Sequence, residues 1–342
     1  MIRVGVLGYG YWGPNLVRNL SEAPGCQVVA VADLRSARLD VARSRYPAIR
    51  TTTDFQDVVN GPDVDAVAIA TPVSTHFDLG MAALGAGKHL LVEKPLTAST
   101  EQALRLIDEA ARRKRVLFVD HTFVYTGAVR KIHELIAADS LGDIYYYDST
   151  RVNLGLFQHD VNVLWDLAVH DLAILDFILA KSPVAVSATG VSHVNGGPEN
   201  TAYVTIFFDD HLIAHVHANW LAPVKVRRTL IGGSRRMILY DDLEASEKIK
   251  VYDKGITVGV SNGEAYQLRV GYRTGDMWAP QIDISEALGV MARHFIQTID
   301  QGILPMTGGE AGLRVVSILE AATESMAHRG RVVELEPMVV GA

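Results

Sequence analysis

A glycine-rich turn near the N-terminus constrains the fold of this chain more than any other feature. The turn, Gly8-Tyr9-Gly10-Tyr11-Trp12-Gly13, follows the apolar run from Ile2 to Leu7. In such a pattern the first glycine permits the tight turn out of a strand. The second lets the backbone approach a pyrophosphate, and the third lets a helix pack closely on the sheet. Pro14 suits the first turn of that helix, whose N-terminus favours anions. The motif therefore predicts a dinucleotide-binding domain.

An acidic residue follows the second expected strand. Val28 to Ala32 forms an apolar run, and Asp33 comes 20 residues after Gly13, the position from which a carboxylate binds the ribose diol of an adenosine. This carboxylate favours NAD, because it would repel the 2′-phosphate of NADP. Arg35 and Arg38 leave NADP open, since an arginine two residues after the acid can accommodate a phosphate.

The length and the segment pattern predict two domains. A chain of 342 residues exceeds the size at which a single core stops growing. Up to about residue 122, strand-like and helix-like segments alternate, which is typical of a doubly wound α/β fold with a parallel sheet, the Rossmann fold. From Val184 to about Arg269, apolar and polar residues alternate. This period predicts a large, mostly antiparallel open sheet in a C-terminal α+β domain, so we expect domains at 1–122 and 123–342.

Composition and charge exclude several classes of protein. The net charge of −7 argues against a nucleic-acid partner. No apolar run of about 18 residues and no signal-like N-terminus is present, so we expect a cytoplasmic protein without a membrane segment. Cys26 is the single cysteine, so an intramolecular disulfide and a cysteine-based zinc site are excluded. His211, His215 and His217 alternate along one expected strand, but no carboxylate or thiolate at fixed spacing joins them. We interpret them as a polar sheet face and expect no metal.

Two short motifs follow strands of the expected parallel sheet. Thr71-Pro72 ends the run 66–70, and Glu93-Lys94-Pro95 ends the strand 89–92. Ligands of such sheets bind beyond the carboxyl ends of the strands. Thr71, Pro72 and Lys94 are therefore expected at the cofactor edge.

A histidine and an aspartate in the second half are the candidates for acid–base chemistry. Hydride transfer from a carbinol carbon requires a base for the hydroxyl proton. His170 is the best candidate, and Asp166, four residues earlier on the expected helix 165–179, would share its face. A cation at Lys94 would lower the pKa of the reacting hydroxyl and stabilise alkoxide charge. The alternative is a structural histidine on a helix.

The two halves together resemble the Gfo/Idh/MocA family of nicotinamide-dependent sugar oxidoreductases. The resemblance spans nearly the whole chain. It rests on the glycine turn, Ala70-Thr71-Pro72 with His76, Gly87-Lys88-His89 leading to Glu93-Lys94-Pro95, the segment 166–171 and the closing helix from Gly309. It implies that Lys94 and His170 share the acid–base work while Asp166 orients the sugar, and it leaves open which of the two takes the proton. It also implies a cis bond before Pro95. The expected cofactor site comprises Gly8, Gly10, Tyr11, Trp12, Gly13, Asp33, Arg35, Thr71, Pro72, His76, Glu93 and Lys94.

The substrate is expected to be a sugar or a nucleotide sugar. The segment from Arg151 to Trp165 precedes the catalytic helix and is dense in hydrogen-bonding groups, and Arg151 could meet a phosphate. This segment and the glycine turn look like the branch with nucleotide-sugar 3-dehydrogenases, acting on UDP-N-acetylglucosamine or its uronate. The alternative is a polar loop that only closes the domain interface. The candidate substrate-binding residues are Lys94, Tyr125, Arg151, Asn153, Asp166 and His170.

Three functional classes stay open at this point. The first is a sugar or nucleotide-sugar dehydrogenase with NAD. The second is another reaction on the same fold, such as reduction of a keto-sugar with NAD(P)H, oxidation of an inositol, or reduction of an imine or enone. The third is a non-catalytic NAD-binding sensor, which the presence of Lys94, Asp166 and His170 disfavours. A broad sheet face with Tyr and Phe also predicts a homodimer or homotetramer through the C-terminal sheet.

Overall fold

The computed structural model of the chain describes residues 1–155, 161–194, 196–259 and 269–336. These residues form two compact units. Unit 1 contains Met1–Thr126 and Ser285–Glu320, and unit 2 contains the described residues of Gly127–Ile284 and of 321–336. The boundary expected at 122 leaves 285–320 to the second domain, whereas these residues belong to the first unit here.

Unit 1 is built on a six-stranded parallel sheet, as the sequence predicts. Its strand order is β3-β2-β1-β4-β5-β6, the order of a doubly wound dinucleotide-binding fold. The strands are β1 (Ile2–Leu7), β2 (Cys26–Ala32), β3 (Arg50–Thr52), β4 (Ala66–Ile69), β5 (His89–Glu93) and β6 (Leu117–Asp120). The central strands are buried on both faces because helices cover both sides, which explains their continuous apolar runs.

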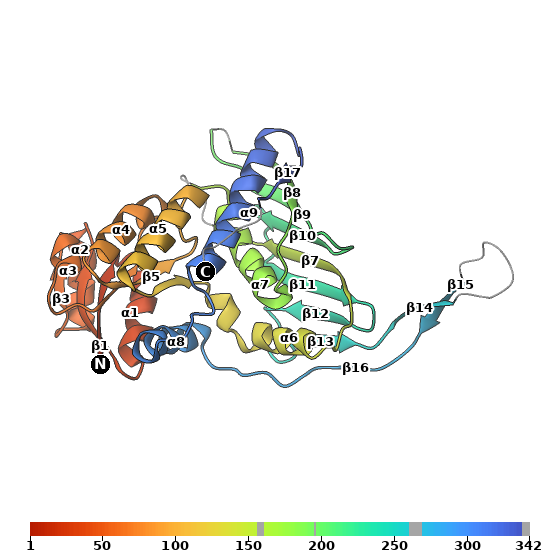
Figure 1. Cartoon of the computed structure of the whole chain (residues 1–342), viewed down its shortest axis with the longest axis horizontal. Coiled ribbons are helices and arrows are strands. Elements are labelled where there is room, and N and C mark those ends of the chain that lie inside the picture. Colours follow the sequence, from red (N-terminus) through yellow and green to blue (C-terminus); the bar gives the residue numbers. More distant parts are fainter. Residues whose placement is uncertain (156–160, 195, 260–268, 337–342) are drawn as a thin grey trace. The chain divides into compact units, whose positions relative to one another are not determined.

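Helices connect and cover these strands (Figure 1). They are α1 (Gly13–Glu22), α2 (Ser36–Arg45), α3 (Gln56–Val59), α4 (His76–Gly85), α5 (Thr100–Arg113), α8 (Ala287–Gln301) and the first part of α9 (Gly309–Ala327), with the short helical turns η1 (Val73–Thr75) and η2 (Thr122–Tyr125). Helix α1 buries Leu16, Val17 and Leu20 on one face because these apolar residues recur at helical spacing. The start of α5 is fixed by Ser99, whose side chain accepts a hydrogen bond from the Gln102 backbone.

Unit 2 contains a nine-stranded sheet of order β16-β13-β12-β11-β7-β10-β9-β8-β17. Every pair in it is antiparallel except β7 with β10, so the prediction of a mostly antiparallel sheet is confirmed. The strands are β7 (Ile144–Val152), β8 (Ala185–Val191), β9 (Thr201–Phe207), β10 (Ile213–Asn219), β11 (Val226–Gly233), β12 (Met237–Asp241), β13 (Ile249–Tyr252), β16 (Met277–Trp278) and β17 (Val333–Glu334). A separate hairpin pairs β14 (Gly255–Gly259) with β15 (Arg269–Arg273).

One face of this sheet is packed and the other is polar. Helices α6 (Gly127–Ala137) and α7 (Val169–Leu179), the latter preceded by the π-helical turn η3 (Leu164–Ala168), complete the unit (Figure 1). In β10, Ala214, Val216 and Ala218 are buried, while His217 stacks on Tyr203 with ring centroids 4.3 Å apart. His211 lies before this strand, so only two of the three histidines share its face.

Neither a membrane helix nor a metal cluster is found in the described part of the chain. No helix there is both long and apolar enough to cross a bilayer. The same residues hold no group of three or more His, Cys, Asp or Glu side chains that could bind a metal ion.

Candidate active site

The glycine turn of unit 1 is tightly constrained at two of its three glycines. Gly8 has a φ of 96°, and a Cβ atom there would lie 2.5 Å from the carbonyl oxygen of Ala70. A Cβ atom at Gly13 would lie 2.2 Å from the oxygen of Gly8. At Gly10 the nearest atom to such a Cβ is on the Arg35 side chain, 3.5 Å away. The protein itself thus needs the first and third glycines, whereas the second leaves open space at the turn. That space fits the approach of a pyrophosphate.

Asp33 is held beside this turn by three hydrogen bonds. Its carboxylate accepts bonds from the backbone N–H groups of Tyr9 at 2.8 Å and Arg35 at 2.9 Å, and from Arg35 Nε at 3.3 Å. Burial opposes the charge, but these bonds outweigh it and hold the pKa of Asp33 below its usual range. The carboxylate is therefore ionised and fixed in position. Tyr11 is 85% exposed and the Arg35 side chain 61% exposed, so both are accessible at this end of the sheet.

His76 joins the two turns at the carboxyl edge of the parallel sheet. It is buried, and its ring nitrogens lie 2.9 Å from the carbonyl oxygens of Thr71 and Pro95. Burial lowers the pKa of His76, and hydrogen bonds to the backbone of Thr71, Pro95 and Leu96 oppose this effect. His76 therefore ties the Thr71-Pro72 turn to the bond between Lys94 and Pro95, which is cis as the sequence resemblance implies. It acts on Lys94 as a positioning residue, and its contact with the cofactor stays a prediction.

Glu93 and Lys94 end β5 beside a residue that the sequence analysis did not single out. Asp120 ends β6 and pairs in register with Glu93. Its Oδ2 accepts a hydrogen bond from the indole Nε1 of Trp12 in the glycine turn, at 3.4 Å. The only sequence signal for Asp120 is an acidic residue at the end of an apolar strand. Trp12, Asp120, Glu93 and Lys94 are thus linked along one edge of unit 1.

In unit 2, Asp166 is held by a tryptophan that the sequence analysis missed. Trp220 is fully buried and donates a hydrogen bond from Nε1 to Asp166 Oδ2 at 3.0 Å. Asp166 lies in η3, and the half-buried His170 lies in the first turn of α7. The expectation of a regular helix through both residues is wrong in this detail, because the turn over Asp166 is π-helical. Such turns occur frequently at functional sites.

Arg151 forms a buried ion pair with Asp171. Its Nε and Nη2 donate to the two carboxylate oxygens at 2.5 and 3.3 Å, and both side chains are 3% exposed. Ser149 Oγ also donates to Asp171, at 2.7 Å. This pairing gives Arg151 a structural role next to the candidate His170. Its predicted contact with a substrate phosphate stays a prediction.

The two other candidate substrate residues have protein partners. Tyr125 is buried in unit 1, with its hydroxyl 3.0 Å from His294 Nδ1 and from Thr307 Oγ1. The half-buried Asn153 donates a hydrogen bond from its backbone N–H to the carbonyl oxygen of Asn219 at 3.0 Å. Their roles in substrate binding stay predictions. Within the polar segment 151–165, residues 156–160 lie outside the described part of the chain.

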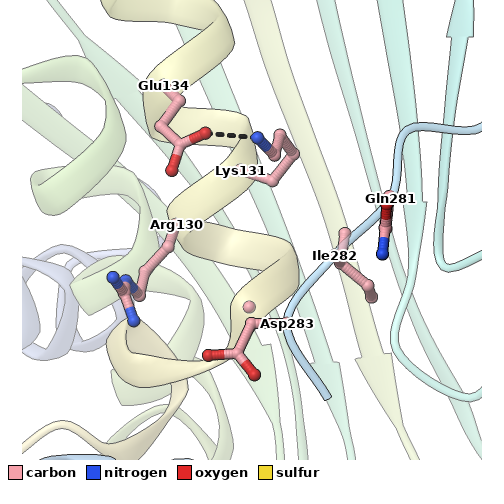
Figure 2. Close-up of a pocket in the computed structure, with 7 residues that line it drawn as sticks. Arg130, Lys131, Glu134, Gln281, Ile282 and Asp283 are labelled. Atoms are coloured by element: carbon pink, nitrogen blue, oxygen red, sulfur yellow. Dashed lines mark hydrogen bonds and ion pairs between the residues drawn. The ribbon is translucent and has the colours of Figure 1, made fainter. Parts of the chain in front are cut away.

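A hollow of about 420 Å³ in unit 2 contains none of the predicted site residues. It lies between α6 and the segment 281–283 (Figure 2). Arg130 and the ion pair of Lys131 with Glu134 line one side, and Gln281, Ile282 and Asp283 line the other. The backbone of Asp283 packs closely on Gly127: a Cβ atom at Gly127 would lie 2.0 Å from the carbonyl oxygen of Asp283. We therefore assign the hollow to packing at the start of α6.

Family models match both halves of the chain. Residues 2–121 match the oxidoreductase family with an NAD-binding Rossmann fold, Gfo/Idh/MocA. Residues 129–239 match the C-terminal domain of the same family. The chain belongs to the Gfo/Idh/MocA family. It is therefore an NAD(P)-dependent oxidoreductase that acts on CH–OH groups of sugar-type molecules.

Several relatives are similar over almost their full length. An uncharacterized oxidoreductase of Escherichia coli, YdgJ, is 28% identical over 96% of this chain and 97% of its own. The NADP-dependent scyllo-inositol 2-dehydrogenase IolW of Bacillus subtilis is 26% identical over 98% and 96%. The solved structure of UDP-N-acetylglucosamine 3-dehydrogenase from Acidithiobacillus ferrooxidans is 26% identical, covers 95% of this chain and 98% of its own, and has a TM-score of 0.79. By their names, the second of these relatives acts on an inositol and the third on a nucleotide sugar.

Proposed function

We propose that this protein transfers a hydride between a hydroxyl-bearing carbon of a nucleotide sugar and NAD. The observation that carries the proposal is the position of Lys94. It directly follows β5 on the sheet edge where Trp12 of the glycine turn binds Asp120, so a cation lies at the cofactor edge. Such a cation stabilises the negative charge that develops on the substrate oxygen.

The cofactor is proposed to lie along the glycine turn and the carboxyl edge of the parallel sheet. Gly8, Gly10 and Gly13 would accept its pyrophosphate at the N-terminus of α1, with Tyr11 and Trp12 beside it. Asp33 would bind the adenosine ribose, and Thr71, Pro72, His76 and Glu93 would lie toward the nicotinamide. When bound, the nicotinamide accepts or gives the hydride. The fixed, ionised Asp33 favours NAD over NADP, and the exposed Arg35 makes NADP the alternative.

Three residues are proposed to handle the proton and orient the substrate. Lys94 neutralises the developing alkoxide charge, and His170 exchanges the hydroxyl proton. Asp166 accepts hydrogen bonds from the sugar, while Trp220 fixes the orientation of its carboxylate. Tyr125, Arg151 and Asn153 are the further predicted substrate residues. Tyr125 and Arg151 are buried among protein partners, which supports a role in positioning other residues rather than direct contact with the substrate.

The substrate class follows from the polar segment and from the relatives. A ligand with many hydroxyl groups suits the segment that begins at Arg151, and C3 of UDP-N-acetylglucosamine or its uronate is the proposed position of oxidation. The full-length similarity to a UDP-N-acetylglucosamine 3-dehydrogenase supports this choice. The similarity to an inositol dehydrogenase favours the second candidate, oxidation of a free inositol or reduction of a keto-sugar.

A substrate panel tests this proposal. Purified protein with NAD or NADP is incubated with UDP-sugars, UDP-sugar uronates, free hexoses and inositols, and the absorbance of the reduced cofactor is followed. We expect reduction with a UDP-sugar at a higher kcat/KM than with any free polyol. A higher kcat/KM for an inositol than for any UDP-sugar would contradict the nucleotide-sugar proposal and support inositol oxidation, the second candidate. Tight NAD binding with no turnover of any of these compounds would contradict the proposed class.

Substitutions test the assigned roles. We expect Lys94→Ala and His170→Ala each to lower turnover by orders of magnitude while the affinity for NAD survives. The exposed Lys225→Ala and His211→Ala are matched controls that should leave turnover unchanged. Near-normal turnover in Lys94→Ala or His170→Ala would remove that residue from its role.

The protein is further proposed to form a homodimer or homotetramer through the outer face of the nine-stranded sheet. Tyr203 is 54% exposed on that face and stacks on His217, which offers a flat aromatic surface to a second copy. Sedimentation of wild type and Tyr203→Glu tests this: the variant should sediment as a monomer. An unchanged oligomer would place the interface elsewhere.

A further inference from the structure

Two carboxyl groups face each other at the cofactor edge of unit 1. Glu93 and Asp120 are the last residues of the neighbouring parallel strands β5 and β6 and stand in register. Glu93 is 9% exposed and Asp120 1% exposed. Two ionised carboxylates in such a place repel each other strongly, because little water is present to screen them.

The hydrogen-bond donors around the two groups are unequally shared. Thr122 Oγ1 donates to one oxygen of Asp120, and Trp12 Nε1 donates to the other. Glu93 Oε1 is buried and has no hydrogen-bond partner among the described residues. Among the described residues the Lys94 backbone N–H acts as a donor to the Glu93 carboxyl group, and a carboxylate with so few donors costs much more to bury than a neutral carboxyl group. The arrangement therefore favours the proton on Glu93.

The neighbouring titratable groups supply one positive charge. Lys94 follows Glu93, and its charge acts on both Glu93 and His121. Burial lowers the pKa of His121 to about 3, and it also lowers the pKa of His76, so neither imidazole is charged at neutral pH. Burial raises the pKa of Tyr125 near Asp120, so this phenol is neutral too. One carboxylate balances Lys94, and a second would be in excess. Burial, the charge of Asp120 and a hydrogen bond to it accordingly raise the pKa of Glu93 well above its usual value.

We propose that Glu93 and Asp120 share a single proton and so present one negative charge to the nicotinamide end of the cofactor site. The pair acts on the cofactor and on Lys94 as a set of positioning residues. In the wild-type protein the protonated Glu93 donates a hydrogen bond to the Asp120 carboxylate. This carboxylate then has three donors, which are Glu93, Thr122 and Trp12. The acid pair, Glu93 with Asp120, holds this charge away from water.

The acid pair has a consequence for the two redox states of the cofactor, and this step rests on the proposed function. The nicotinamide ring is cationic in NAD⁺ and neutral in NADH. One negative charge at this end of the site would therefore stabilise bound NAD⁺ relative to bound NADH. The acid pair would bias the enzyme toward the oxidised cofactor and so toward oxidation of its substrate.

A double-mutant cycle tests the shared proton. The affinities for NAD⁺ and NADH are measured by titration for wild type, Glu93→Gln, Asp120→Asn and the double variant. Glu93→Gln leaves the charge on Asp120, and Asp120→Asn leaves it on Glu93, whose proton is released once the neighbouring charge is gone. We expect each single variant to keep the ratio of the two affinities within about twofold of wild type. The double variant should lose discrimination for NAD⁺ by on the order of tenfold, since it alone has no charge.

Each other outcome contradicts the proposal. Single variants that each shift the ratio, with a double variant near the product of the two shifts, would mean two independent carboxylates. No shift in any variant would mean that the pair carries no charge that the cofactor senses. Glu101→Gln, whose side chain is 82% exposed, is the matched control and should behave as wild type. Failure of the wild-type protein to bind either form of the cofactor would instead contradict the proposed function.

A second measurement is independent of cofactor binding. The infrared band of a protonated carboxyl group should be present in wild type and in Glu101→Gln at neutral pH, where exposed carboxyl groups are ionised. It should be absent from the double variant. A wild-type spectrum without this band would overturn the shared proton even if a variant folds poorly.

Discussion

The buried ion pair of Arg151 with Asp171 allows a quantitative prediction for Asp171→Asn. The substitution removes the charge that faces a guanidinium only 3% exposed, and it weakens the bonds at 2.5 and 3.3 Å. Removal of one partner of a buried pair costs about 3 to 5 kcal/mol because the other charge stays buried. We expect a loss near the lower end, about 3 kcal/mol, because the charge of Asp242 also acts on Arg151. For a unit of this size, that loss lowers the melting temperature by about 10 °C.

The assay is urea unfolding followed by circular dichroism, with melting as a second measure. Asp40→Asn is the matched control, because Asp40 pairs with Arg43 at 2.7 Å but the side chains are 67% and 53% exposed. Such a surface pair contributes little to stability, so the control should unfold like wild type. The double variant Arg151→Met/Asp171→Leu should recover part of the loss, since it removes both charges.

Two results would refute this reasoning. A loss below about 1 kcal/mol in Asp171→Asn would mean that water or another group compensates Arg151. Unchanged stability together with a raised KM for the substrate would instead return Arg151 to the substrate site, where the sequence analysis placed it.

Three further predictions concern the cofactor, Asp166 and the cysteine. Asp33→Asn should raise the ratio of kcat/KM for NADP over NAD by about tenfold, because the repelling charge is lost while Arg35 remains; an unchanged ratio would count against Asp33. Trp220→Phe removes the donor to Asp166 and should lower kcat by about tenfold without changing NAD affinity, and a loss of NAD affinity would contradict this assignment. Burial raises the pKa of Cys26 to about 12, so at pH 8 iodoacetamide should label the folded protein at least about a hundredfold more slowly than the unfolded protein; equal rates would show an accessible thiolate.

Local patterns in the sequence predicted much of the fold. The glycine turn, the apolar strand before it and Asp33 lie within 33 residues of the N-terminus, and each has its own backbone or hydrogen-bond requirement. The second expected strand, the apolar run from Val28 to Ala32, lies within β2 because most of its side chains are buried in the sheet. By contrast, β3 has three residues, Arg50–Thr52, and no apolar pattern, so it was not expected. Its place depends on pairing with β2 rather than on its own composition.

The parts of the candidate site that the sequence did not predict depend on contacts between distant residues. Trp220 binds Asp166 across 54 positions, and Trp12 binds Asp120 across 108. No local spacing specifies such pairs, because strand order and register bring them together. The same holds for Glu93 and Asp120, which become neighbours only through the pairing of β5 with β6. The burial of Arg151 likewise depends on a tertiary contact, its pair with Asp171. From the sequence alone, an arginine in a polar segment was expected to be exposed and to bind a substrate phosphate.

Residues 285–320 belong to unit 1 although they follow most of unit 2 in the sequence, and this order affects folding during synthesis. Beside the outermost strand β6, the backbone N–H of Val119 donates to the Thr307 oxygen at 2.7 Å, and Thr307 Oγ1 donates to the Val119 oxygen at 2.7 Å. An uncovered strand edge is a template for aggregation. During synthesis this edge stays open until Thr307 has left the ribosome. A fragment that ends at residue 122 would therefore keep the dinucleotide-binding motif and still be prone to self-association.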